Sequence, residues 1–276
     1  MALIEGLGSI GKLRGALDQP VQYHLPIGEQ QLPLNQSLGR TLRLEVAGDI
    51  HCQHCGRRTK KSYSQGYCYP CMLKLARCDS CIMSPEKCHY HLGTCREPSW
   101  GEQFCMTDHI VYLANSSGLK VGITRASQIP TRWIDQGASQ AIPILRVATR
   151  LQSGLVEDLL RQQVADRTNW RALLKGEPEP LDMLAARDRL LAGAEQGIAA
   201  LQQQYGLQAI QILDMPVVDI QYPVLEYSAK PQSINLDKTP VLEGTLLGIK
   251  GQYLLLDTGV INIRKYTAYT LSCSVS

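Results

Sequence analysis

Eight cysteines lie between Cys52 and Cys95, and six of them form three Cys-x2-Cys pairs. Two cysteines three positions apart on a tight turn can bind one metal ion together, and two such pairs complete a tetrahedral thiolate site for zinc. The first two pairs, Cys52/Cys55 and Cys68/Cys71, have this spacing. Because four thiolates leave no open position on the ion, we expect a structural zinc site rather than a catalytic one.

A second structural zinc site is expected after the first. Cys78, Cys81 and Cys88 supply three ligands, and the fourth is either Cys95 or His91. We favour Cys95, because the same six-residue spacer that separates Cys81 from Cys88 also separates Cys88 from Cys95. Further cysteines and histidines downstream would suffice for a third metal, although packing and hydrogen bonding are the simpler roles for them.

The loop between Cys55 and Cys68 is basic and rich in tyrosine. From position 51 to position 77 the chain has six Lys or Arg residues and no acid. Cations bind phosphates and aromatic rings stack on bases, so this composition favours contact with nucleic acid. A solvated loop, or a protein-binding surface made of the same tyrosines, is the alternative. The residues that we expect to bind nucleic acid are Arg57, Arg58, Lys60, Lys61, Tyr63 and Tyr67.

These candidate sites need elements that hold them. Residues 1–50 and 235–276 both contain short strand patterns with glycine turns. Each set is too short to form a stable sheet alone, so we expect the N-terminal β segment (1–50) to pair with the C-terminal one (235–276). Residues 51–105 form a double zinc-binding module, whose loop has so few aliphatic residues that thiolate–metal bonds must supply its folding free energy.

Residues 106–175 are expected to form an α/β domain, and residues 176–234 a helix and linker. Two apolar runs, 109–114 and 119–124, flank an Asn-Ser-Ser-Gly turn and predict a β-hairpin. Ser153 is expected to cap one helix, and Gly206 to end another that begins near position 182. The predicted fold class is α+β: a small zinc ribbon or knuckle, a three-stranded sheet with helices, and a β domain built from both termini.

Residues 108–172 resemble the GIY-YIG nuclease domain, about a quarter of the chain. In that family, a strand tyrosine, the Tyr-Ile-Gly of the next strand, a helix arginine and a later glutamate converge on one phosphate. Ile110 stands where the first glycine would be, and Lys120 replaces the tyrosine of the second motif. Asn169 is similar to a polar residue that some members place after the glutamate. The matching segments are His109-Ile110-Val111-Tyr112-Leu113, Lys120-Val121-Gly122-Ile123-Thr124, Arg132 and Glu157.

The resemblance implies phosphodiester hydrolysis at these residues. Glu157 would hold a single Mg²⁺ or Mn²⁺, and Arg132 would grip the phosphate with both guanidinium arms. Tyr112 would position or deprotonate the attacking water, and Lys120 would contact phosphate or act as a base. The simpler alternative is that Glu157 and Arg161, four residues apart on one helix, form an exposed ion pair.

The whole chain also resembles an uncharacterised bacterial and archaeal family, a domain of unknown function. The shared motifs are the paired cysteines, Gly-Thr-Cys-Arg at 93–96, Trp-Gly-Glu at 100–102, Pro-Thr-Arg-Trp-Ile-Asp-Gln-Gly-Ala at 130–138 and Gly-Ile-Lys-Gly-Gln-Tyr-Leu at 248–254. This resemblance implies no activity.

The composition of the chain indicates its cellular compartment more clearly than its binding partner. The net charge of +3 is mild, and no run approaches the ~20 apolar residues of a membrane span. Ten cysteines without an export signal favour a cytoplasmic protein with metal-bound thiolates. We therefore expect a zinc-containing protein that binds DNA or RNA and, as a further step, hydrolyses it. The alternatives are a non-catalytic nucleic-acid-binding module and a protein-interaction module, so the sequence leaves open whether the chain is an enzyme.

Overall fold

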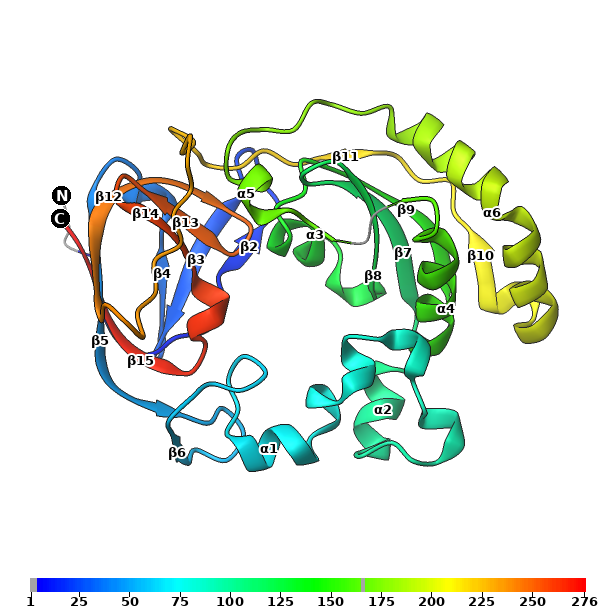
Figure 1. The fold of residues 1–276 in the computed structure, drawn as a ribbon, viewed down its shortest axis with the longest axis horizontal. Coiled ribbons are helices and arrows are strands. Elements are labelled where there is room, and N and C mark those ends of the chain that lie inside the picture. The colour runs from blue at the N-terminus through cyan, green and yellow to red at the C-terminus, as the bar shows by residue number, and fades with distance from the viewer. Residues whose placement is uncertain (1–3, 165–166) are drawn as a thin grey trace.

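The two ends of the chain lie side by side in one antiparallel sheet (Figure 1). The computed structural model describes residues 4–164 and 167–276. In this seven-stranded sheet the N-terminal and C-terminal strands are neighbours. Strands from the two terminal segments alternate over the first four positions, and two further C-terminal strands follow. The order is β1 (Ile4–Ser9), β15 (Tyr269–Val275), β5 (Thr41–His51), β12 (Val241–Lys250), β13 (Tyr253–Leu256) and β14 (Gly259–Asn262), with β6 (Arg58–Thr59) paired to the end of β5.

A second, three-stranded sheet completes this β domain. It consists of β2 (Arg14–Ala16), β3 (Gln22–Ile27) and β4 (Gln30–Pro33), and it packs against β1 and against the helix α3 (Thr131–Asp135). Alternate residues of β3 and β15 are buried, as expected for strands with one face on a core.

The third sheet has β7 (His109–Asn115) between β8 (Leu119–Arg125) and β9 (Gln140–Val147), all antiparallel. The short strands β10 (Ile210–Ile212) and β11 (Val218–Asp219) extend the far edge of β9. The predicted hairpin is confirmed, since β7 and β8 pair residue for residue across the expected turn. Gly118 has φ +117°, a conformation that only glycine adopts without strain.

Helices cover one face of the third sheet, and the β domain covers the other. The helical side is formed by α4 (Arg150–Leu160) and α6 (Met183–Tyr205), whose buried residues join those of β7 and β9 in one cluster. On the opposite face, Tyr112 shares a cluster with Trp133 of α3 (Thr131–Asp135) and with Leu44 of the β domain. The two domains therefore share a core, and α5 (Trp170–Leu173) lies over β13 with its Trp170 ring stacked on Tyr253.

The starting point of α4 differs from the sequence prediction. Thr149, not Ser153, is the cap, because Thr149 and Gln152 form a reciprocal pair of side chain to backbone hydrogen bonds. Ser153 lies inside the helix and donates to the carbonyl of Arg150. Gly206 does end α6, as predicted.

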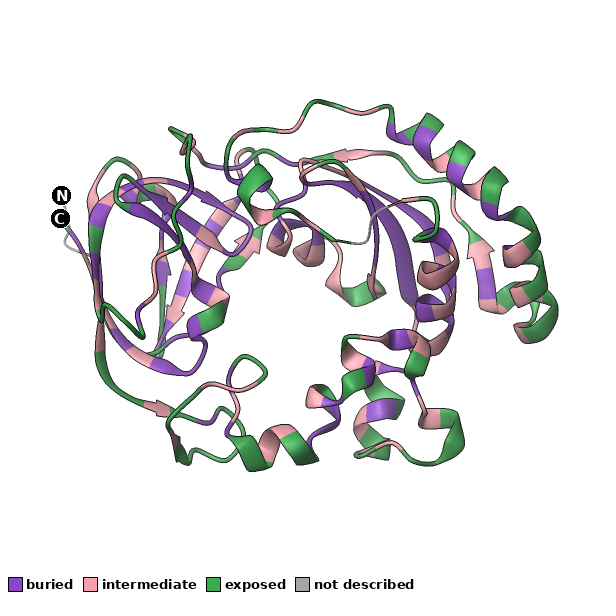
Figure 2. Cartoon of the chain, in the orientation of Figure 1, coloured by how far each residue is buried: buried purple, intermediate pink, exposed green. Residues whose placement is uncertain are grey.

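Residues 51–105 bridge the two domains with little regular structure (Figure 1). They contain β6, α1 (Tyr69–Lys74), α2 (Pro98–Phe104) and several short 3-10 helices. Figure 2 shows mostly exposed and intermediate residues here, in contrast to the buried strands of the sheets. The chain is thus α+β, as predicted. Within the described ranges, no helix combines the length and the apolar character needed to cross a membrane.

Candidate functional site

Four cysteine sulfurs meet where β5 leads into the bridging segment. Cys52 follows the end of β5, Cys55 lies in the next turn, Cys68 precedes α1 and Cys71 lies within it. The four sulfur atoms lie within 4.8 Å of one another, with 3.7 Å between those of Cys55 and Cys68. The spacing prediction for these four residues is confirmed at this level: they gather close enough to hold one metal ion.

The local charges show why this cluster fits a cation. Burial raises the pKa of Cys52, but backbone N–H groups of Cys55, Cys68 and His54 outweigh it and leave that pKa at about 6. Burial and the three neighbouring sulfurs raise the pKa of Cys71 to about 12. Ionisation of Cys52 is thus favoured, whereas ionisation of Cys71 is opposed by repulsion from the neighbouring sulfurs. A divalent cation between them would remove that repulsion. An all-sulfur donor set at this spacing is the one that zinc takes in structural sites.

The remaining cysteines and histidines do not form a second compact group of four thiolates. Cys81, Cys88 and Cys105 are buried, and Cys88 and Cys105 hydrogen-bond each other. Cys78 points elsewhere, toward the Ser64 hydroxyl. Cys95 directs its sulfur at the carbonyl of Glu97, at 3.5 Å. His91 is exposed.

A different trio has its donor atoms within 4.8 Å: Asp79, Cys81 and His89. Arg96 lies 2.7 Å from the Asp79 carboxylate, so a protein cation already occupies that donor. His89 Nε2 lies 3.5 Å from the same carboxylate, and the other ring nitrogen, Nδ1, is 2.7 Å from the Thr94 hydroxyl.

The basic loop is tied to the β domain and only partly reaches a cavity. Of the six residues predicted to bind nucleic acid, Tyr67 lines a cavity, whereas the others lie outside it. Arg58 forms an exposed ion pair with Asp49 at 2.9 Å. Lys61 lies over the ring of Tyr63, 5.6 Å from its centroid. Arg57 and Lys60 are exposed.

Tyr112 and Gly122 face each other across β7 and β8. A β-carbon on Gly122 would lie 2.7 Å from the Tyr112 hydroxyl, so only glycine lets the phenol lie there. The hydroxyl donates to Gln136 Oε1 at 2.8 Å and is hydrogen-bonded by Arg132. Burial raises the pKa of Tyr112, against the lowering effect of Arg132. Tyr112 is therefore a neutral phenol near pH 7, which suits positioning and argues against a role as base.

Arg132 and Glu157 line one cavity of about 500 Å³ with Gly122, and the charge of Glu157 acts on Tyr112. Arg161, the residue after the end of α4, forms an ion pair with Asp158. Three of the five predicted catalytic residues, Tyr112, Arg132 and Glu157, are thus brought together.

Lys120 and Asn169 are placed differently from those three. The Lys120 amine is buried and donates to Thr168 Oγ1 at 2.7 Å. Asn169 caps α5 by accepting from the backbone N–H groups of Arg171 and Ala172. Neither residue lines the cavity that Arg132 and Glu157 share.

Two cavities lie next to each other where the bridging segment faces both domains. The 500 Å³ cavity and a second one of about 650 Å³ share Lys12, Ile82, Met83 and Arg264 as walls, and we call the two together the basic groove. Among the residues that the structure describes, nine cations line it against three acids, Asp79, Asp135 and Glu157, while the whole chain has a net charge of only +3. The cations are Lys12, Arg14, Arg77, Arg125, Arg132, Arg150, Arg161, Arg167 and Arg264.

Gln252, in the loop between β12 and β13, fixes one wall of the groove. Its amide accepts from the N–H of Leu13 at 2.8 Å and donates to the carbonyl of the same residue at 2.9 Å. It also donates to Asp135, which pairs with Lys12. These contacts join residues more than a hundred positions apart, so no local pattern in the sequence could have revealed Lys12 or Arg264 as groove residues.

Comparison with known proteins identifies the family. A family model described as a protein of unknown function (DUF2797) matches residues 39–271, most of the chain, and the protein belongs to that family. No curated protein matches the chain, and no solved structure matches it.

Proposed function

We propose that this member of the DUF2797 family binds nucleic acid along the basic groove. The observation that carries the proposal is the concentration of nine cationic side chains in two adjoining cavities, in a chain whose overall charge is close to neutral. Phosphodiester backbones are polyanions, and neutralising them with arginine and lysine supplies most of the sequence-independent binding free energy.

The acids of the groove offset only part of this charge. Asp79 is paired with Arg96, which lies outside the groove, whereas Asp135 offsets one groove cation, Lys12, and is also bound by Gln252. Arginine is also the residue that matches phosphate oxygens with two parallel hydrogen bonds. A concave, arginine-lined surface of this kind fits phosphates better than it fits a neutral ligand or a cation.

The binding test measures affinity against salt. We expect labelled DNA and RNA oligonucleotides to bind with an affinity that falls linearly with the logarithm of salt concentration. Binding that is absent, or that does not respond to salt, would contradict the proposal. Salt-insensitive capture of a protein instead would favour an interaction module.

Hydrolysis of the bound strand is a second function, favoured by the convergence of Tyr112, Arg132 and Glu157. The central position of β7 between β8 and β9, with the arginine on the next helix and the glutamate on the one after β9, supports the resemblance to GIY-YIG nucleases. Arg132 would bind the non-bridging oxygens and stabilise the charge that develops on the phosphate. Tyr112, a neutral phenol held by Gln136, would orient the water that attacks the phosphorus.

Glu157 fits a weakly bound Mg²⁺ or Mn²⁺. Its carboxylate lies in the same cavity as the Thr124 hydroxyl, and oxygen donors of this kind suit a hard ion that keeps several waters. When bound, such an ion would help to activate water and to stabilise the leaving oxygen.

Neighbouring acids on α4 provide a matched test of hydrolysis. We expect metal-dependent cleavage of labelled DNA or RNA by the unaltered protein, its loss in Glu157→Gln, and its retention in Asp158→Asn, since Asp158 does not line the cavity. Binding should survive in both variants. Cleavage that persists in Glu157→Gln would exclude this site, and binding without cleavage would indicate a non-catalytic module.

A second zinc ion, bound by Cys81, Cys88 and a third buried thiolate, remains a proposal. The pairing of Cys88 with Cys105 supports Cys105 as that third donor in place of Cys78. Elemental analysis should find two zinc ions per chain, two in Cys78→Ser and one in Cys105→Ser. Two zinc ions per chain in Cys105→Ser, or one in Cys78→Ser, would instead support Cys78 as a ligand, as the spacing of the cysteines predicts.

A further inference from the structure

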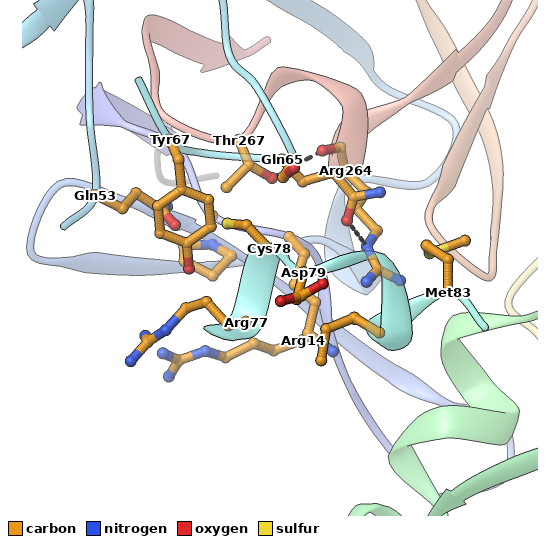
Figure 3. Close-up of a pocket in the computed structure, with 15 residues that line it drawn as sticks. Arg14, Gln53, Gln65, Tyr67, Arg77, Cys78, Asp79, Met83, Arg264 and Thr267 are labelled. Atoms are coloured by element: carbon orange, nitrogen blue, oxygen red, sulfur yellow. Dashed lines mark hydrogen bonds between the residues drawn. The ribbon is translucent and has the colours of Figure 1, made fainter. Parts of the chain in front are cut away.

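The larger cavity of the groove has walls of a different kind from the smaller one. Besides cations, it contains an aromatic ring, that of Tyr67, and the side-chain amides of Gln53 and Gln65. Figure 3 shows Tyr67 together with the long side chains of Arg14 and Arg77 around this cavity. Aromatic faces, arginine planes and amides are the groups that contact unstacked bases, whereas phosphates need only the cations.

Two of the cavity's cations are available for a ligand. Within the described part of the chain, no ion pair joins Arg14 or Arg77 to a carboxylate. The one acid of this cavity, Asp79, is 8% exposed and already paired with Arg96. The Met83 side chain, 86% exposed, adds an apolar surface at the boundary with the smaller cavity.

Backbone strain is concentrated in the wall that holds Tyr67. Ser64 and Gln65 have φ values of +43° and +62°, a left-handed region that is unfavourable for residues other than glycine. The surroundings hold them there: Arg264 Nε donates to Gln65 Oε1 at 2.5 Å, and Tyr63 and Tyr67 exchange two backbone hydrogen bonds. Strain that the surrounding structure maintains is typical of ligand sites, where it fixes side chains in advance.

We propose that this cavity receives a nucleobase that is unstacked from its strand, so that the substrate is single-stranded nucleic acid. The inference rests on the proposed binding of phosphates in the groove. The two cavities share Lys12, Arg264, Ile82 and Met83, so a backbone held by the smaller cavity can direct the adjoining base into the larger one. A duplex keeps its bases paired and stacked, and it would have to pay for flipping one out before it could bind in this way.

An abasic strand separates base contact from phosphate contact. Fluorescence anisotropy would compare a labelled thymidine single strand, a strand of abasic sites of equal length, and the duplex. One stacked base contributes ~1–3 kcal/mol, so we expect the thymidine strand to bind about tenfold or more tightly than the abasic strand.

Substitutions at Tyr67 test whether this residue causes the difference in affinity between the thymidine strand and the abasic strand. Tyr67→Leu should abolish the preference for bases while leaving the affinity for the abasic strand unchanged, and Tyr67→Phe should keep the preference. Tyr69→Leu is the matched control, because Tyr69 is 52% exposed on α1 and does not line the cavity. The zinc content of each variant reports whether the loop between the cysteine pairs is still folded.

The results of these binding experiments test the base pocket separately from the proposed binding of phosphates in the groove. Equal affinity for thymidine and abasic strands, or a preference for the duplex, would overturn the base pocket while phosphate binding stood. A preference for bases that survives Tyr67→Leu would place the contact elsewhere and also overturn it. If no strand bound in a salt-dependent way, the proposed function would fail together with the inference.

Discussion

The hydroxyl of Tyr112 lies against Gly122, its partner residue on the neighbouring strand, at the position where any other side chain would begin. Tyr112 is fully buried, and its hydroxyl is held by Gln136 and Arg132. The pairing of β7 with β8 thus holds the Tyr112 hydroxyl next to the Arg132 guanidinium, at the cavity that Gly122 lines. Glycine is needed at this position because of a tertiary contact and not because of a turn.

Gly122→Ala should destabilise the protein, because the new methyl group would lie 2.7 Å from the Tyr112 ring and hydroxyl. Overpacking of this kind costs roughly 1–3 kcal/mol, which denaturant unfolding measures. Gly176→Ala is the control, since a β-carbon there meets nothing within 4 Å. Equal stability of the two variants would mean that Tyr112 can move aside easily.

Removal of zinc should unfold residues 51–105 and spare the rest. The segment has few buried side chains apart from its cysteines, so metal–thiolate bonds must hold it, whereas α6 packs on its own apolar cluster. After chelation, limited proteolysis should cut within 51–105 while α6 stays protected. Cys68→Ser should behave like the chelated protein, and Cys273→Ser, in β15, should not. An unchanged cleavage pattern with zinc verified absent would show that the metal does not hold this segment.

Arg161→Ala should weaken binding of all oligonucleotides alike. Arg161 lines the groove, and loss of one phosphate contact reduces the slope of log K against log salt by about 1. Arg43→Ala is the control, because Arg43 is also an ion-paired arginine, with Glu45 and Glu243, but it does not line the groove. Titrations at several salt concentrations give both slopes, and identical slopes would remove Arg161 from the interface.

Glu177→Gln should cost more stability than Lys250→Met. The Lys250 ammonium is fully buried, 3.0 Å from Glu177, and burial lowers the pKa of Lys250 against the raising effect of Glu177. Loss of the carboxylate would leave a buried charge that has neutral partners but no counter-ion: the Tyr227 hydroxyl, a backbone carbonyl and the Tyr222 ring. We expect a cost of about 2 kcal/mol, less than for a fully buried pair because Glu177 is half exposed. Lys250→Met removes the charge itself. Urea unfolding measures the free energy of unfolding of both variants. A larger loss of stability in Lys250→Met than in Glu177→Gln would show that the unpaired ammonium is not what destabilises the protein.

Local patterns in the sequence predicted features that depend on neighbouring residues. The hairpin of β7 and β8, the end of α6 at Gly206 and the gathering of Cys52, Cys55, Cys68 and Cys71 are all encoded within short stretches. The predicted cap at Ser153 was wrong for a local reason as well: Thr149 has Gln152 three residues later and can form a reciprocal cap, which Ser153 cannot.

The sequence by itself determined the composition of the first cysteine cluster and the class of the fold, because spacing and periodicity act over a few residues. The candidate residues Tyr112, Arg132 and Glu157 came from the resemblance of residues 108–172 to a known family. Only the tertiary structure decided which cations share a groove. Lys12 and Arg264 come from opposite ends of the chain, and they line the same cavities because the terminal strands pair and Gln252 ties Leu13 to the far side of the β domain. Such long-range contacts depend on the whole packed core, which no local pattern records.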